Sequence, residues 1–416
     1  MMKKIAILLL CVFVAIVKTE PVNAEKPIED GGSRAPEIDA LARDINSKDW
    51  ETRRAAVASL HKMVIEKQGD DMAAFLPVVE PLMTLSGWGG IARKQSTTAA
   101  DILAVIGKPA VPRLLAGLSS PEARERRVSA RILTAMRPRP PGLTGALSPL
   151  ISDNDRFVRW ACYDCLGRLG KDAQEAVPLL KAALVHLPPE SNIYGRLALI
   201  QITGKTKPHV ARIAALLRHN DASVRRLAAS KLGDIGPPAK DSWKGLLRGL
   251  ADSDRSVRGA SAFSLGAIGA DSKKVVTALL RILENDEEYE IRRSAASSLG
   301  KLGANARAAI PALARALDNS AEDRSPNRER TGWAVAARAV GEIGGPSAVP
   351  VLVKALANAD PYIRGTAARQ LGALEALASP ALPALQKAAK DPFVGRLALE
   401  AIQKIEEALA LSTERQ

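Results

Sequence analysis

One recurring pattern constrains the fold of this chain more than any other feature. It is clearest in DSDRSVRGASAFSLGAIG (residues 252–269), where an acidic residue stands three positions before an aliphatic-Arg pair, small residues follow, and Leu-Gly comes near the end. Close copies occur at 153–170, 221–236, 287–303 and 360–374, with fainter copies elsewhere, and the eleven copies are 30 to 43 residues apart. A similar spacing kept over so many copies indicates a repeat array.

Each repeat unit is predicted to form two helices. First halves such as VPRLLAGL (111–118) and IPALARAL (310–317) have apolar residues at helical spacing and a proline in the first turn. Second halves start with an acidic residue suited to the N-cap and end at glycine, which ends helices readily. One helix pair cannot bury its apolar stripe alone, so the pairs must stack. The sequence therefore predicts an all-α, right-handed α-solenoid of about eleven units.

The repeat resembles the HEAT repeat, specifically the short HEAT-like repeats first described in phycobilin lyases. The pattern D-x-x-V-R-x-x-A-A-x-x-L-G-x-I-G carries this resemblance over roughly residues 35 to 410. In HEAT proteins the aspartate and arginine of the unit join a hydrogen-bond ladder between neighbouring repeats. The resemblance implies that role here for Asp155, Arg159, Asp221, Arg225, Asp254, Arg258, Asp360 and Arg364.

The N-terminus reads as a secretory signal peptide over residues 1–24. Lys3 and Lys4 precede 13 apolar residues, and Val22-Asn23-Ala24 places small residues where a signal peptidase cleaves. The apolar run is short for a membrane span, although an uncleaved N-terminal anchor is the alternative. We therefore expect cleavage after Ala24 and an exported protein, periplasmic or secreted, with no transmembrane segment after cleavage.

The rest of the chain reads as one continuous domain. A short linker at 25–35 leads into the repeat array at 36–410, and residues 411–416 form a tail. A polar insertion at 318–332 lengthens one repeat. Such insertions tend to lie on one face of a solenoid, although simple drift in loop length also explains it.

The outward positions of the second helix are the candidate binding residues. Second helices line the concave surface in HEAT-like arrays, and the second and sixth positions after the aliphatic residue lie opposite its buried stripe. The candidates are Arg54, Arg127, Arg131, Trp160, Tyr194, Arg226, Phe263, Arg293, Arg338, Arg369 and Arg396. Arginines interleaved with aromatic residues suit an acidic or polyanionic ligand. A solvated basic face without a ligand is the alternative.

Residue types that carry catalysis or bind cofactors are scarce. Cys162 and Cys165 have the spacing of a redox pair, but Cys162 takes the small-residue slot of the repeat and is predicted to fill the core. None of the four histidines is followed by glutamate, unlike in the di-iron HEAT enzymes, and the glycines of residues 252–269 are not followed by the Lys-Ser/Thr of a phosphate loop. We expect no catalytic residue, no metal and no cofactor.

These observations favour an exported, non-enzymatic scaffold whose concave face binds a protein or an acidic polymer, acting as a monomer. Nucleic-acid binding is the first alternative because the formal net charge is +14, although export argues against it. Attachment of a chromophore, as the resemblance to phycobilin lyases implies, is a more distant alternative, because those enzymes act inside the cell.

Overall fold

The computed structural model describes residues 35–66, 72–86, 93–270, 273–318 and 333–413. Within these ranges the chain forms eleven successive helix pairs. The pairs are α2 (Ala35–Ile45) with α3 (Trp50–Glu66), α4 (Leu76–Ser86) with α5 (Arg93–Ile106), α6 (Val111–Gly117) with α7 (Ala123–Ala135), α8 (Leu143–Leu147) with α9 (Arg156–Leu169), α10 (Val177–Ala183) with α11 (Pro189–Thr203), α12 (Lys207–Ala215) with α13 (Ala222–Ile235), α14 (Trp243–Gly249) with α15 (Arg255–Ala267), α16 (Lys273–Asn285) with α17 (Tyr289–Lys301), α18 (Ile310–Asp318) with α19 (Ala334–Ile343), α20 (Ala348–Ala355) with α21 (Pro361–Ala373), and α22 (Leu382–Ala388) with α23 (Gly395–Thr413). The predicted signal peptide (1–24), nearly all of the linker, most of the insertion and the end of the tail lie outside these residues.

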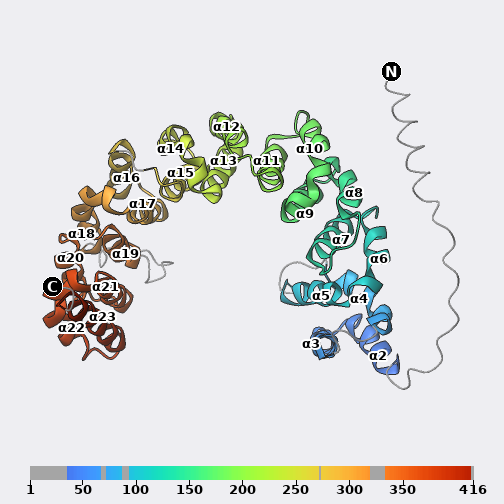
Figure 1. Cartoon of the computed structure of the whole chain (residues 1–416), viewed down its shortest axis with the longest axis horizontal. Helices are drawn as coiled ribbons and strands as arrows, with labels where there is room; N and C mark the ends of the chain where they lie inside the picture. The colour runs from blue at the N-terminus through green and yellow to red at the C-terminus, as the bar shows by residue number, and fades with distance from the viewer. Residues whose placement is uncertain (1–34, 67–71, 87–92, 271–272, 319–332, 414–416) are drawn as a thin grey trace.

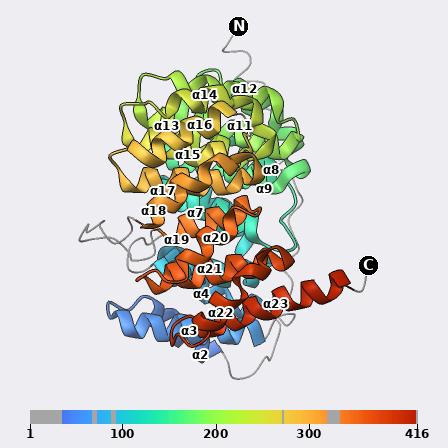
Figure 2. The ribbon, with the colours of Figure 1, turned by 90° about the vertical axis from the view of Figure 1, so that its left-hand side faces the viewer.

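The pairs stack into an arch, which confirms the predicted all-α solenoid. Figure 1 shows the second helix of each pair, from α3 to α23, on the inner side of the arch and the first helices on the outer side. In the view turned by 90°, the pairs from α14 to α22 succeed one another from top to bottom (Figure 2). The inner helices therefore form the concave surface, where the predicted binding residues lie.

The helix boundaries follow from local chemistry at the start and end of each inner helix. The Asp254 carboxylate accepts hydrogen bonds from the backbone N–H groups of Ser256 (2.8 Å) and Val257 (3.1 Å), which otherwise have no partner at a helix start. Asp155, Asp221 and Asp360 cap α9, α13 and α21 in the same way. Helix α13 ends at Gly236, whose φ of 74° suits glycine.

The core is made of aliphatic residues and alanines in a thin layer between stacked pairs. Glycines allow the inner helices to approach closely: a Cβ atom on Gly266 of α15 would lie 2.6 Å from the Cα atom of Ser298 in α17. The buried residues form two clusters, and α11 contributes Ile193 to one cluster and Leu199 to the other. The two clusters therefore meet at α11, near the middle of the arch.

Helix α11 is one residue out of the register that the sequence pattern suggests. It buries Ser191, Gly195, Ala198 and Leu199, at the spacing at which α15 buries Val257, Ser261, Ser264 and Leu265. Tyr194 therefore occupies the third position after the start of the stripe, where the pattern placed it at the second. Neither Ser191 nor Asn192 is the aliphatic residue that starts the stripe in the clear copies, so the pattern gives no firm register here.

Candidate functional site

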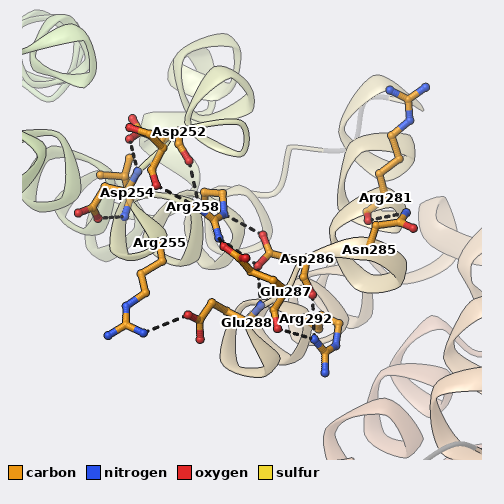
Figure 3. Close-up of polar contacts among 12 residues, drawn as sticks. Asp252, Asp254, Arg255, Arg258, Arg281, Asn285, Asp286, Glu287, Glu288 and Arg292 are labelled. Atoms are coloured by element: carbon orange, nitrogen blue, oxygen red, sulfur yellow. Dashed lines mark hydrogen bonds and ion pairs between the residues drawn. The ribbon is translucent and has the colours of Figure 1, made fainter.

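The inner helices are connected by arginines at the predicted ladder position. Arg258 of α15 donates from Nε to Asp286 Oδ2 (2.8 Å) and from Nη2 to Oδ1 (3.3 Å), at the entrance to α17 (Figure 3). Its Nη1 also donates to the carbonyl oxygens of Asp252 (3.2 Å) and Ser253 (3.4 Å) in its own repeat. One guanidinium thus joins the turn of its own repeat to the turn of the next.

The ladder arginines pair with carboxylates that precede the next inner helix. Arg225 pairs with Asp252 (2.8 Å) and Arg364 with Asp391 (2.9 Å), three and four residues before α15 and α23. The four aspartates expected in the ladder, Asp155, Asp221, Asp254 and Asp360, cap helices instead. Asp391 does both, because it also accepts hydrogen bonds from the N–H groups of Phe393 (2.8 Å) and Val394 (3.3 Å).

Among the four arginines expected in the ladder, Arg159 is the one whose partner in the next repeat is not a carboxylate. Its Nε donates to the Ser191 hydroxyl (3.0 Å), while Nη1 donates to the carbonyl oxygens of Asp153 (2.6 Å) and Asn154 (3.0 Å). The α9–α11 interface therefore carries a hydrogen bond from a charged guanidinium to a neutral hydroxyl, whereas the α7–α9 interface carries an ion pair. Arg126, which the sequence analysis did not select, forms such an ion pair with Asp153 (2.7 Å).

Burial and pairing shift the ionisation of these groups. The hydrogen bond from Arg225 holds the pKa of Asp252 below its ordinary value of 3.8, and burial opposes that effect only in part. The hydrogen bond to Asp286 raises the pKa of Arg258 above its ordinary value. Because the carboxylate pKa is lowered on folding, the ladder stabilises the fold above about pH 4, and this contribution is lost as the pH falls further.

Two of the predicted aromatic residues meet between neighbouring inner helices. The rings of Trp160 on α9 and Tyr194 on α11 lie 4.8 Å apart between centroids, and Phe157 meets Trp160 edge-on at 5.3 Å. Phe157 is 42% exposed, whereas Trp160 and Tyr194 are half-buried. The three rings form a continuous aromatic surface across the α9–α11 interface.

Cations surround these rings. The guanidinium carbon of Arg156 lies 4.8 Å from the Phe157 ring centroid and 5.7 Å from that of Trp160, and Arg127 lies 6.0 Å from Phe157. The Lys231 ammonium on α13 lies 5.7 Å from the Tyr194 ring. These three rings and three cations are called the aromatic–basic patch below. Within the described residues, neither Arg127 nor Arg156 forms an ion pair.

A pocket of about 570 Å³ opens beside the patch. Its walls come from α9, α11 and α13 and include Trp160, Tyr194, Leu197 and Lys231, together with the carboxylates of Asp164 and Asp234. Apolar walls with a few polar groups are typical of sites that receive one side chain or a small ligand.

Phe157, Arg156 and Lys231 were not among the binding residues predicted from the sequence. Phe157 and Arg156 lie three and four residues before Trp160, so they share its helix face. Extending the outward row by one turn toward the helix start would have included them. Lys231 belongs to the next inner helix, and only the stacking of α13 on α11 places it near Tyr194.

The other predicted binding residues differ in whether they have a partner. Arg293, Arg338 and Arg396, in the C-terminal half of the arch, pair with Glu290 (2.8 Å), Glu342 (3.5 Å) and Glu400 (3.5 Å) of their own helices. Arg131, Arg226 and Arg369 are exposed and form no ion pair among the described residues. Arg54 lies 5.7 Å from the Trp50 ring. Phe263 is 43% exposed, contacts Lys301 at 4.1 Å and lies apart from the other rings.

The two cysteines are free and buried in α9. Burial raises the pKa of the Cys162 thiol well above its ordinary value and that of Cys165 to about 11, so both are held in the unreactive thiol form. Within the described ranges, no group of three or more His, Cys, Asp or Glu residues is placed to hold a metal ion. Among the helices described, none has both the length and the apolar character needed to cross a bilayer.

The comparison with known proteins places the chain in a family. The family model described as HEAT repeats matches residues 111–191, 243–328 and 330–406, more than half of the chain. The chain therefore belongs to the HEAT repeat family. No curated protein matches the sequence.

Several solved structures are similar to this chain in fold. One is an engineered protein, with 19% identity and a TM-score of 0.41. The matched region covers 89% of this chain and 99% of the engineered chain. Another is Kap121p bound to Pho4p, with 14% identity, a TM-score of 0.43, and coverage of 91% and 46%. A third is Kap95p in its complex with RanGDP, with 13% identity, a TM-score of 0.48, and coverage of 89% and 62%. This chain thus spans about half of the length of Kap121p.

Proposed function

We propose that this chain is an exported, non-enzymatic scaffold that binds an acidic protein segment, or another acidic polymer, on the concave face of its solenoid. The aromatic–basic patch is the observation that carries the proposal. It combines half-exposed rings with guanidinium groups that have no carboxylate partner among the described residues.

The geometry of Arg156 explains the preference for an acidic ligand. Its guanidinium carbon lies over the rings of Phe157 and Trp160, and the attraction of the cation to both rings holds it in place. The N–H edge of a stacked guanidinium keeps its donors, and this fork matches the two oxygens of a carboxylate. Arg127 adds a second cation beside the same ring.

The rings supply the other part of the binding energy. Tryptophan, tyrosine and arginine dominate the binding energy of protein interfaces when they lie together near a pocket. Trp160 and Tyr194 line the pocket of about 570 Å³, which offers space for one apolar side chain of the partner. Because Asp164 and Asp234 also line this pocket, the anchor residue of the segment should be apolar, and its acidic residues should lie at Arg127 and Arg156.

Export and the absence of catalysis rest on the sequence. The basic, apolar and small-residue segments of residues 1–24 support a cleaved signal. The carboxylates at the repeated positions cap helices or pair with ladder arginines, and the histidines form no catalytic motif. Duplex nucleic acid is the second candidate ligand because of the net charge of +14.

We expect charge reversal within the patch to weaken the binding of an acidic polymer by at least about tenfold. The test uses residues 25–416 and a fluorescent random copolymer of glutamate and tyrosine, with anisotropy measured near 0.15 M salt. The variant is Arg127→Glu with Arg156→Glu. The matched control, Arg293→Glu with Arg338→Glu, makes the same charge change on the same face and should alter binding by less than about twofold.

Two outcomes would reject the proposal. Equal losses in the two double variants would mean that net charge alone attracts the polymer. Tighter binding of duplex DNA than of the copolymer, with a steep salt dependence, would support the nucleic-acid alternative.

We expect the mature protein to begin at Glu25 and to lie outside the cytoplasmic membrane. Fractionation of the producing cell, followed by N-terminal sequencing and intact mass measurement, checks both points. A chain that keeps residues 1–24 and fractionates with membranes would instead indicate the uncleaved anchor.

A further inference from the structure

A second pocket lies beside the aromatic–basic patch, toward the N-terminal end of the arch. It has a volume of about 450 Å³ and lies between α5, α7 and α9, where α7 and α9 end. Its lining includes Arg131 and Arg168 from the helices and Arg137 and Arg139 from the segment that follows α7. None of these four arginines belongs to the ladder between the inner helices.

The lining is strongly positive. Its charged members are these four arginines together with Asp101 and Asp164, which gives a formal net charge of +2. Asp164 is already paired with Arg168 (2.9 Å). Arg131 has no ion pair within the described residues, so its whole guanidinium is available to a ligand.

Two of the arginines are held in place by backbone carbonyl groups. Nη1 of Arg137 donates to the carbonyl oxygens of Thr134 (3.0 Å), Ala135 (3.2 Å) and Met136 (2.7 Å). Arg139 donates from Nη2 to the carbonyl oxygen of Arg168 (3.1 Å) and from Nη1 to Asp172 Oδ2 (3.2 Å), and its Nε is buried without an acceptor in the described structure. Both guanidinium groups are thus fixed in place, and Nε and Nη2 of Arg137 have no protein partner among the described residues, which is the pre-organisation that anion binding requires.

The geometry points to a binding site for a phosphate monoester, with the phosphoryl dianion among the four arginines. Arginine forks match phosphate oxygens in pairs, and a dianion balances the charge of +2, whereas a single carboxylate would leave the pocket positive. The volume exceeds that of a bare phosphate, and Ala100, Val128, Ile132 and Ala135 supply apolar walls for a small organic body.

This inference goes beyond the proposed function, because a small phosphate monoester would bind here without any macromolecule. The phosphoryl group has two sources: a free small molecule, or a phosphorylated residue on a partner. Phenyl phosphate represents the first source, and a phosphotyrosine peptide with neutral flanking residues represents the second.

The test is a calorimetric titration of residues 25–416 with phenyl phosphate, with benzoate as the monoanionic comparison. We expect saturable binding of phenyl phosphate that is at least about tenfold tighter than that of benzoate. Arg131→Gln and Arg168→Gln should each weaken it by about tenfold. Arg226→Gln, an exposed arginine without an ion pair outside the pocket, should change it by less than about twofold.

Asp101→Asn provides a test in the opposite direction that loss of folding cannot mimic. Removing this carboxylate from the lining should tighten phenyl phosphate binding by about threefold. Binding of the phosphopeptide but not of phenyl phosphate would assign the phosphoryl group to a macromolecular partner. No saturable binding of either probe, or equal losses in Arg131→Gln and Arg226→Gln, would overturn the inference, whatever the result with the acidic copolymer.

Discussion

Replacing Arg258 by methionine should lower the free energy of unfolding by about 3 kcal/mol, because it leaves a buried carboxylate without its partner. The side chain of Asp286 is only 4% exposed, and Arg258 supplies both of its ion-pair contacts. Methionine keeps the apolar stem and removes the charge. Urea denaturation, combined with hydrogen exchange of the peptides from α15 and α17, measures the effect where it arises.

Arg255 is the matched control, because it lies in the same helix and also forms an ion pair with the next repeat. Its contact with Glu288 (3.0 Å) joins side chains that are 71% and 38% exposed, so Arg255→Met should cost less than about 1 kcal/mol. Adding Asp286→Asn to Arg258→Met should recover part of the loss by removing the stranded charge. A double variant as unstable as the single one would contradict the ladder as an electrostatic element.

Replacing Gly266 by alanine should destabilise the array by about 2 kcal/mol, because the new methyl group would meet the backbone of the next inner helix. The Cβ atom would lie 2.6 Å from Cα and from Oγ of Ser298, and a backbone cannot move aside as a long side chain can. The separation of α15 from α17 would have to grow. Thermal denaturation of Gly266→Ala, compared with Gly259→Ala in the same helix, checks the size and direction of the change.

Gly259 in the same helix provides the opposite expectation. A Cβ atom there would approach only Cγ1 of Ile291, at an ordinary contact distance of 3.6 Å. Alanine at this position should therefore stabilise the helix by about 0.5 kcal/mol, as it does at unstrained helical sites. If both substitutions shifted the melting temperature in the same direction, close helix approach would not be the reason for glycine at 266.

The fold could be predicted from the sequence because its signals are local and repeated. Asp254 before α15 and the proline near the start of α18 each mark a helix start within a few residues, and many copies agree. The register of α11 could not be predicted from the pattern, because neither Ser191 nor Asn192 is the aliphatic residue that starts the stripe in the clear copies. The ladder partner of Arg258 could not be predicted either, since it depends on which turn of the next repeat comes within reach.

The candidate site was predictable only in part. Trp160 and Tyr194 stand in the outward row, but their contact depends on how α11 packs against α9. The pairing of Arg338 with Glu342 is visible in the sequence as a spacing of four residues on one helix. The pocket around Arg131 depends on the path of the segment after α7, which no periodic signal describes.

The division of the core within α11 has a mechanical consequence for the arch. Stacked repeats behave as springs in series, each interface bearing the same load, so the least packed interface takes up most of any change in the span between the ends. Leu199 of α11 packs in the same cluster as α9, whereas Ile193 belongs to the cluster of α13, so the apolar core is interrupted at the step from α11 to α13. Tyr194 and Lys231 lie on the two sides of this step. A ligand in the pocket that both residues line would therefore join α11 to α13 and restrict the change in distance between the two ends of the arch.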